Sequence, residues 1–302
     1  MNATVPTSPA LEPLPTVRID KLPILLLPAL GLIALPLVHS FSTWVTLTFA
    51  GLAMGMIIFI IASGLTLVFG LMDDLNFGHG VFITLGAFVA TTVMARLAPW
   101  ADSLSLVRNL MAVVPAMAAG LIVAALVGLV FERLVIRPVY GQPLRQIMIT
   151  MGGMIIGVEL IKALWGAQAI PLLLPEGLRG SILFGDAAVE KYRIIAVVVG
   201  LAIFGGMLWV LGRTKVGLLI RAGVQDREMV ESLGYRIGRL FIVIIIGGLG
   251  SVGGCFIGSL LVGLVANYAG FLAPKVALFS NILLMVAVLM WRPQGLYPVV
   301  KR

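Results

Sequence analysis

The chain is a succession of long apolar stretches separated by short polar breaks. Each stretch of about 20 apolar residues, with no alternation of period two, predicts an α-helix long enough to cross the roughly 30 Å hydrocarbon core of a bilayer. We therefore predict an all-α, polytopic membrane protein with about eight transmembrane helices. The predicted spans are 22–38, 44–70, 80–98, 109–131, 146–165, 192–211, 240–267 and 276–291.

Two of these spans are too long for simple crossings, because 44–70 and 240–267 would each extend about 40 Å as straight helices. The second contains five glycines within 247–254. Glycine permits irregular turns, and a broken helix at membrane depth lines a cavity or is buried in protein. We predict a break or re-entrant turn at 247–254, which would leave Cys255 near a polar surface. Close packing of ordinary helices is the alternative.

The composition agrees with a membrane protein, since 60% of the residues are hydrophobic and 11% are charged. A single cysteine excludes an internal disulfide and a cysteine metal site, so Cys255 is interpreted as a small packing residue. Residues 1–21 are Pro-rich and polar and precede no clear cleavage site. We predict that 1–21 form a cytoplasmic amino-terminal tail and that 22–302 form one transmembrane domain.

The distribution of basic residues predicts the orientation. With the amino terminus inside, two thirds of the Lys and Arg residues fall in cytoplasmic segments, so the positive-inside rule places both termini in the cytoplasm. The net charge of +8 is explained by contact with anionic membrane lipid and requires no nucleic acid partner. The largest outer loop, 167–191, is either a docking surface or a solvated connector.

The motifs of soluble catalysis are absent from the sequence. There is no GxxxxGK[ST] phosphate loop, no GxSxG nucleophile elbow, and no second ligand near His39 or His79 for a metal. The one ionisable pair inside a predicted span is Glu159 with Lys162, toward the outer end of its span, where a structural ion pair is favoured over a proton relay. These features indicate a pore that is not an enzyme and that takes energy from another subunit.

The charged loop 213–239 is the natural place for such a partner. Residues 222–234 read as a short helix with Asp226 and Glu228 in the first turn and Gly234 after its end. Met229, Val230 and Leu233 would form an apolar face ringed by charge. This face favours a groove on a partner protein over the alternative of lying on lipid.

Several motifs resemble those of the branched-chain amino acid ABC importer permeases. The segments Gly64-Leu65-Thr66-Leu67-Val68-Phe69-Gly70, Asn76-Phe77-Gly78-His79-Gly80 and Leu85-Gly86-Ala87 are similar to the amino-terminal signature of that family. Its coupling segment resembles the loop that contains Gln225, Asp226, Arg227, Glu228, Met229, Leu233 and Gly234. Glu132-Arg133 to Arg137-Pro138 and Trp291-Arg292-Pro293-Gln294-Gly295-Leu296 also agree.

The resemblance implies a non-enzymatic pore subunit of a bacterial inner-membrane importer that binds no cofactor itself. Its expected partners are a second homologous permease, two cytoplasmic ATPase subunits that use ATP and Mg, and a periplasmic solute-binding protein. The solute would be a branched-chain amino acid, although permeases for urea and short amides look much alike.

For the substrate path we predict Thr66, Asn76, Gly78, His79 and Gly80. A helix that starts near Gly80 would direct free N–H groups at a solute carboxylate. The alternative for this motif is a helix-breaking turn with a satisfied histidine.

One departure from the family pattern follows Gly238-Arg239-Leu240-Phe241, where the chain lacks about one span and its outer loop. If the remaining run folds back instead of crossing once, the last span reverses direction. Two other functions therefore stay open: a stand-alone secondary transporter, and a membrane scaffold with no transported solute.

Overall fold

The computed structural model describes residues 22–72, 76–168, 170–172, 174–215 and 252–291. These residues are mostly helical, and six helices are long and apolar enough to cross a membrane, with two shorter apolar helices at Pro23–Val38 and Phe279–Trp291. The prediction of an all-α, polytopic membrane protein is confirmed. The helices are α1 (Leu22–Val38), α2 (Phe41–Met72), α3 (His79–Arg96), α4 (Ala98–Ala101), α5 (Leu106–Phe131), α6 (Pro143–Trp165), α7 (Lys191–Arg213), α11 (Val252–Leu272) and α12 (Pro274–Trp291).

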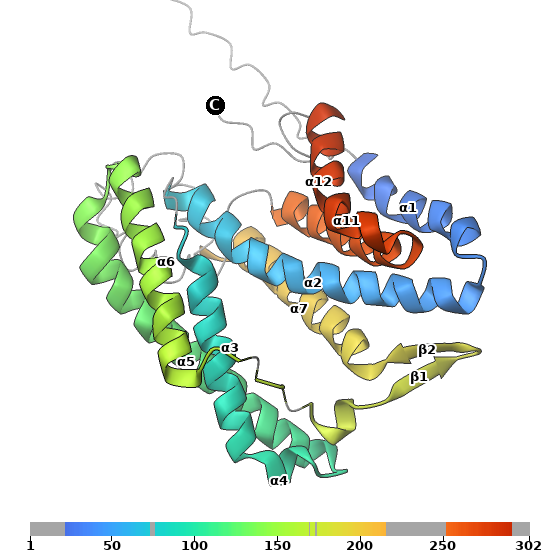
Figure 1. Cartoon of the computed structure of the whole chain (residues 1–302), viewed down its shortest axis with the longest axis horizontal. Coiled ribbons are helices and arrows are strands. Elements are labelled where there is room, and N and C mark those ends of the chain that lie inside the picture. Colours follow the sequence, from blue (N-terminus) through green and yellow to red (C-terminus); the bar gives the residue numbers. More distant parts are fainter. Residues whose placement is uncertain (1–21, 73–75, 169, 173, 216–251, 292–302) are drawn as a thin grey trace, which may run out of the picture.

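The first bundle is built around α2, which packs against α1, α7 and α11, while α12 packs against α11 (Figure 1). Helices α2 and α11 run antiparallel and touch through their backbones. A Cβ built on Gly263 would lie only 2.4 Å from the Gly51 carbonyl oxygen and from the Gly55 nitrogen. Residues Gly51 and Gly55 form a Gly-x-x-x-Gly motif, and such small residues let membrane helices approach closely.

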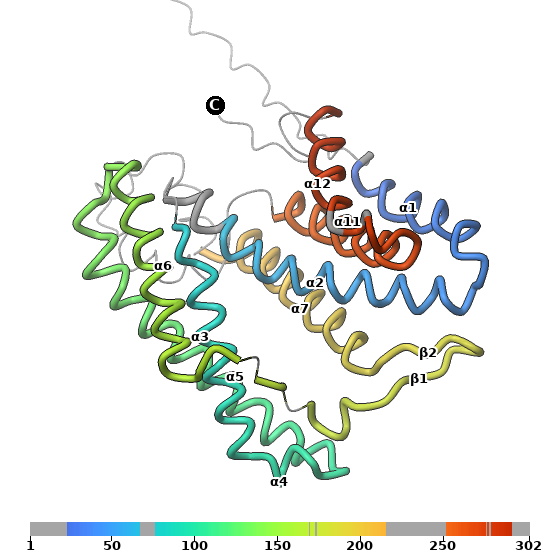
Figure 2. The backbone as a smooth tube through the Cα atoms, viewed as in Figure 1, coloured from blue at the N-terminus to red at the C-terminus, as the bar shows by residue number. Residues whose placement is uncertain are grey.

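The second bundle consists of α3, α4, α5 and α6 (Figure 2). Here α3 and α5 cross where Gly86 meets Gly120, since a Cβ on Gly120 would lie 2.5 Å from the Gly86 carbonyl oxygen. Helix α5 continues into a π-helical turn, η1 (Glu132–Ile136), and a 3-10 turn, η2 (Arg137–Val139). The Tyr140 hydroxyl then donates a 2.8 Å hydrogen bond to Glu132 and closes this end of the bundle.

A β-hairpin in the loop after α6 was not predicted from the sequence. Strands β1 (Ser181–Phe184) and β2 (Ala187–Glu190) pair antiparallel. The hairpin lies on α2: the Thr46 hydroxyl donates to the Ala188 carbonyl at 3.3 Å, and Phe184 stacks on Phe49. The loop is therefore a packed element at the start of α2 and not merely a solvated connector.

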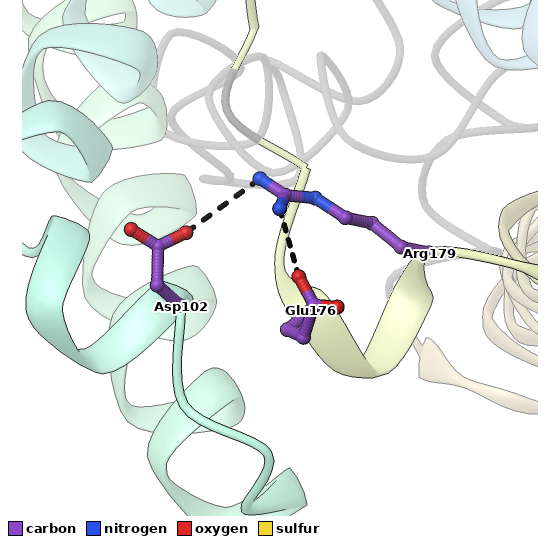
Figure 3. A network of polar contacts seen from close by, with 3 residues as sticks. All are labelled: Asp102, Glu176 and Arg179. Carbon is purple, nitrogen blue, oxygen red and sulfur yellow. Dashed lines mark hydrogen bonds and ion pairs between the residues drawn. The ribbon is translucent and has the colours of Figure 1, made fainter.

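The same loop also contacts the second bundle. The Arg179 guanidinium forms ion pairs with Glu176 at 2.7 Å, in the 3-10 turn η3 (Glu176–Leu178), and with Asp102 at 3.6 Å, just after α4 (Figure 3). The three side chains are between 38% and 56% exposed, so water screens these pairs and they add little stability. Beside them Gly177 packs against the Asn109 side chain of α5. The loop thus touches both bundles at one end of the molecule.

The predicted turn at 247–254 is only partly within the described residues. Helix α11 is continuous from Val252, so Gly253 and Gly254 are helical, and the segment 240–251 lies outside the described part of the chain. With 21 residues, α11 extends about 31 Å, which is long enough to cross a membrane by itself. Cys255 packs beside Phe59, Met207 and Val252, an apolar setting rather than the polar one that a turn there would have given.

Candidate solute-path site

The motif Asn76 to Gly80 folds into a tight turn between α2 and α3. The Asn76 side-chain oxygen accepts a 2.9 Å hydrogen bond from the Gly78 N–H, which is the Asx-type turn that asparagine favours. Helix α3 begins at His79, with Gly78 as its N-cap residue. Gly78 is buried, and a Cβ there would lie 3.1 Å from the Asn76 oxygen. A side chain at position 78 would therefore crowd the bond that forms the turn.

His79 fixes this turn against α2. The imidazole lies on Gly64, where an added Cβ would be 3.0 Å from both Cε1 and Nε2 of the ring. The buried Nε2 atom of the ring has no hydrogen-bond partner within the described residues, so the histidine is held here by packing. His79 is thus held between two helices, and Gly64 provides the space that it occupies.

On the other side, the turn is fixed against α6. The Phe77 N–H donates a 3.4 Å hydrogen bond to the Thr150 hydroxyl, and the Thr150 side chain is fully buried. Gln146, one turn before Thr150, is also buried, and its side-chain nitrogen has no partner within the described residues. The turn therefore joins α2 of the first bundle to α6 of the second through polar groups inside apolar helices.

The hydrogen bonds within the turn bear on the predicted carboxylate site. The Gly78 N–H is bonded to Asn76, the His79 N–H to the Asn76 carbonyl at 3.4 Å, and the Val81 N–H to the Gly78 carbonyl at 3.0 Å. The turn itself thus satisfies most of the donors that a solute carboxylate would need. This arrangement fits the helix-breaking turn better than an open anion site.

The five predicted path residues are only partly brought together. Asn76, Gly78 and His79 form one hydrogen-bonded unit. Gly80 is exposed and has open space around its Cα, while Thr66 is half-buried on α2, two residues after Gly64. The structure therefore supports a packed turn at residues 76–79, and the solute contacts of all five residues remain predictions.

The predicted coupling residues, Gln225, Asp226, Arg227, Glu228, Met229, Leu233 and Gly234, lie outside the described residues, as do both chain termini. The loop 213–239 that contains them follows α7. Helix α7 ends at Arg213, and the described chain continues as far as Lys215. The end of α7 lies at the same end of the molecule as several other helix ends (Figure 1). These are the ends of α2 and α5 and the starts of α3 and α6.

Several residues that position the site were not found by sequence reasoning. Thr150 bonds to the turn from α6, and Gly64 receives His79. The signal for Thr150 was available, because polar residues inside an apolar span usually bond to another helix. The role of Gly64 depends on where the turn returns, which local sequence does not reveal.

Comparison with known proteins gives one family and several relatives. The family model for the branched-chain amino acid transport system permease component matches residues 47–244. The chain is 27% identical over 299 residues to the high-affinity branched-chain amino acid transport system permease protein BraD of Pseudomonas aeruginosa, which covers 82% of this chain and 93% of BraD. It is 24% and 23% identical to the LivH permease proteins of Salmonella typhimurium and Escherichia coli, with 78% of this chain and 77% of each relative covered. No solved structure matches the chain.

The BraD comparison also bears on the missing segment. Since 82% of 302 residues is about 248, the 299-residue alignment is about 50 positions longer than the part of this chain that it covers. The LivH alignments of 242 positions cover about 236 residues of this chain and so contain far fewer gaps. The comparisons do not place these gaps along the chain, and the loss of a span near Leu240 stays a prediction.

Proposed function

Because the chain belongs to the family of branched-chain amino acid transport permease components, we propose that it is the membrane-embedded subunit of an ATP-driven importer for branched-chain amino acids. The match over residues 47–244 carries this proposal, since it includes the Asn76–Gly80 turn and the 213–239 loop. The permease subunit is not an enzyme.

The energy for transport would come from two separate ATPase subunits that use ATP and Mg. The sequence has no phosphate loop, and its most charged segment, 213–239, follows α7 at the end of the molecule where the Asn76–Gly80 turn lies. A movement of this loop would therefore begin close to the turn that joins the two bundles. The remaining partners in the proposal are a second, homologous permease and a periplasmic solute-binding protein.

The proposed location is the bacterial inner membrane, with both termini in the cytoplasm. In that orientation the hairpin, α4 and the Arg179 ion pairs face the periplasm, where a solute-binding protein would arrive. Helix α11 supports a single crossing, because it runs antiparallel to α2 from the level of Phe59 to that of Thr48, where the Tyr268 and Thr48 hydroxyls lie 2.8 Å apart. Helix α12 would then return to the cytoplasmic side.

Within this proposal, the Asn76–Gly80 turn connects the two bundles, and Gly80 is the member of the predicted path that is exposed with open space around its Cα. His79 and Asn76 would act mainly by holding the turn in shape. A solute that passes near this point would meet Gly80 first. This assigns the polar residues of the motif to positioning and leaves direct contact to its edge.

The proposal is tested by isolating the tagged chain from membranes that also contain the other products of its operon. We expect two ATPase chains and a second permease to co-purify in fixed proportion. A stand-alone secondary transporter would purify without ATPases and would accumulate solute in vesicles that contain no ATP. A scaffold would bind partners, but its deletion would leave solute uptake unchanged.

A further inference from the structure

Asn109, in the first turn of α5, has a buried side chain that forms no hydrogen bond. The residue is 3% exposed, and neither Oδ1 nor Nδ2 has a partner within the part of the chain that the structure describes. Most buried polar groups are bonded to protein or to water, because an unmade bond leaves the loss of hydration uncompensated. The Asn109 amide is therefore in an unfavourable state as long as it stays covered.

The 3-10 turn η3 covers this amide. A Cβ built on Gly177 would lie 2.6 Å from Nδ2 and 3.7 Å from Cγ of Asn109, so the backbone of the turn rests directly on the side chain. This separation leaves no room for a water molecule between Gly177 and the amide nitrogen. The turn thus closes over a group that would form hydrogen bonds if water reached it.

The ion pairs of Arg179 add little to this closure. Arg179 pairs with Glu176 within the same short segment and reaches across to Asp102, after α4, at 3.6 Å (Figure 3). Of the two pairs, the one with Asp102 links the turn to the second bundle, and its side chains are 44% and 56% exposed. Water screens a pair of this kind. The closed turn therefore gains little polar stabilisation from either Asp102 or Asn109.

The position of η3 makes its contact with Asn109 a link between the two bundles. Shortly after Arg179 the chain enters the hairpin, which is fixed to α2 by the bond from Thr46 to Ala188. Within the described residues, extensive packing of helix on helix stays inside each bundle. The η3 contact thus connects the bundles at one end of the molecule, as the Asn76–Gly80 turn does at the other (Figure 1).

We propose that residues 176–179 form an outer clasp between the bundles, which is closed in this structure and lifts from Asn109 in each transport cycle. The inference rests on the proposed function, because it assumes that solute moves past the two bundles. When the clasp lifts, water reaches both polar atoms of the amide, and the new hydrogen bonds offset the lost contacts with Gly177 and Asp102. The buried amide thereby keeps the closed and open states close in free energy.

Asn109→Leu distinguishes such a clasp from a fixed plug. Leucine has nearly the shape of asparagine but needs no hydrogen bond, so it should stabilise the closed state. We expect the melting temperature of the assembled importer to rise and the maximal rate of uptake to fall several-fold, because opening becomes harder. A lower melting temperature with an unchanged rate would show that the amide is permanently bonded and that the turn is a fixed plug.

The direct test locks the clasp with a disulfide between Gly177→Cys and Asn109→Cys. A Cβ at position 177 lies 3.7 Å from the Cγ of Asn109, which is the place that a cysteine sulfur would take. With Cys255→Ser, the chain has no other cysteine. In proteoliposomes that contain the complete assembly, oxidation should lower ATP-driven uptake by about tenfold or more, and reduction should restore it. Uptake by the control, Gly177→Cys with Cys255→Ser, should not respond to the oxidant.

The count of free thiols after oxidation shows whether the disulfide has formed. If it forms and uptake is unchanged, the clasp does not open and the proposal is wrong. If it does not form, η3 does not rest on Asn109 in the assembled protein, and the proposal is equally wrong. If the disulfide forms but the unsubstituted chain supports no ATP-driven uptake in the same assembly, it is the proposed function that fails.

Discussion

The imidazole of His79 occupies the space that a side chain at Gly64 would need. A Cβ on Gly64 would lie 3.0 Å from two atoms of the ring. This contact joins α2, the central helix of the first bundle, to the start of α3 in the second bundle, at the turn that carries the family motif. It gives the glycine and the histidine of that motif a shared structural role.

Gly64→Val should therefore displace His79 and lower the free energy of unfolding by about 1–3 kcal/mol. Adding His79→Ala removes the obstruction, so the double variant should recover much of this loss, and the two effects should be non-additive. Thermal unfolding of the purified protein measures both. Gly80→Ala is the control, because the space around Gly80 is open. Additive effects of the two substitutions would show that the contact is unimportant.

The turn itself depends on the Asn76 side chain. Asn76→Ala removes the acceptor for the Gly78 N–H and should destabilise the protein by about 1–2 kcal/mol. Asn76→Asp keeps an acceptor at the same place and should lose less stability. Equal losses in thermal stability for the two variants would argue against the hydrogen bond. A normal stability but altered uptake in Asn76→Asp would indicate that the side chain also meets the solute.

The α2–α11 crossing permits no side chain at Gly263. Gly263→Ala would place a methyl group against the backbone of Gly51 and Gly55, which cannot move as a flexible side chain can. We expect a loss of about 1–3 kcal/mol or more, seen as lower expression and a lower melting temperature. Gly258→Ala on the same helix meets open space and should be tolerated. Similar behaviour of both variants would contradict the close crossing.

The sequence predicted the helices well because apolar length is a strong signal in a membrane protein. Helix α1 and the predicted span 22–38 have the same ends, and α5, α6 and α7 differ from the predicted spans by only a few residues. The hairpin at 181–190 was missed because its stability comes from packing on α2 through Phe49 and Thr46, which are far away in the sequence.

The candidate site was predicted less completely for a similar reason. The motif residues Asn76, Gly78 and His79 were recognised, but Gly64 and Thr150, which hold them, lie on other helices. Such relations between helices are tertiary and leave little local signature.

The coupling loop offers a test of the link to the ATPases. Met229→Asp or Leu233→Asp would place an unpaired carboxylate in an apolar groove, at a cost of several kcal/mol, enough to release a partner. We expect uptake to be abolished while the protein still inserts into the membrane. Retained ATPase subunits with normal stimulation of hydrolysis in either variant would show that the docking role of this loop is wrong.

The most direct test of the central claim is uptake of radiolabelled leucine into proteoliposomes that contain the complete assembly and receive the solute-binding protein. We predict accumulation only when ATP and Mg reach the ATPase side, and none when this chain is left out. Accumulation by this chain alone without ATP, or unchanged ATP-driven uptake in its absence, would contradict the account.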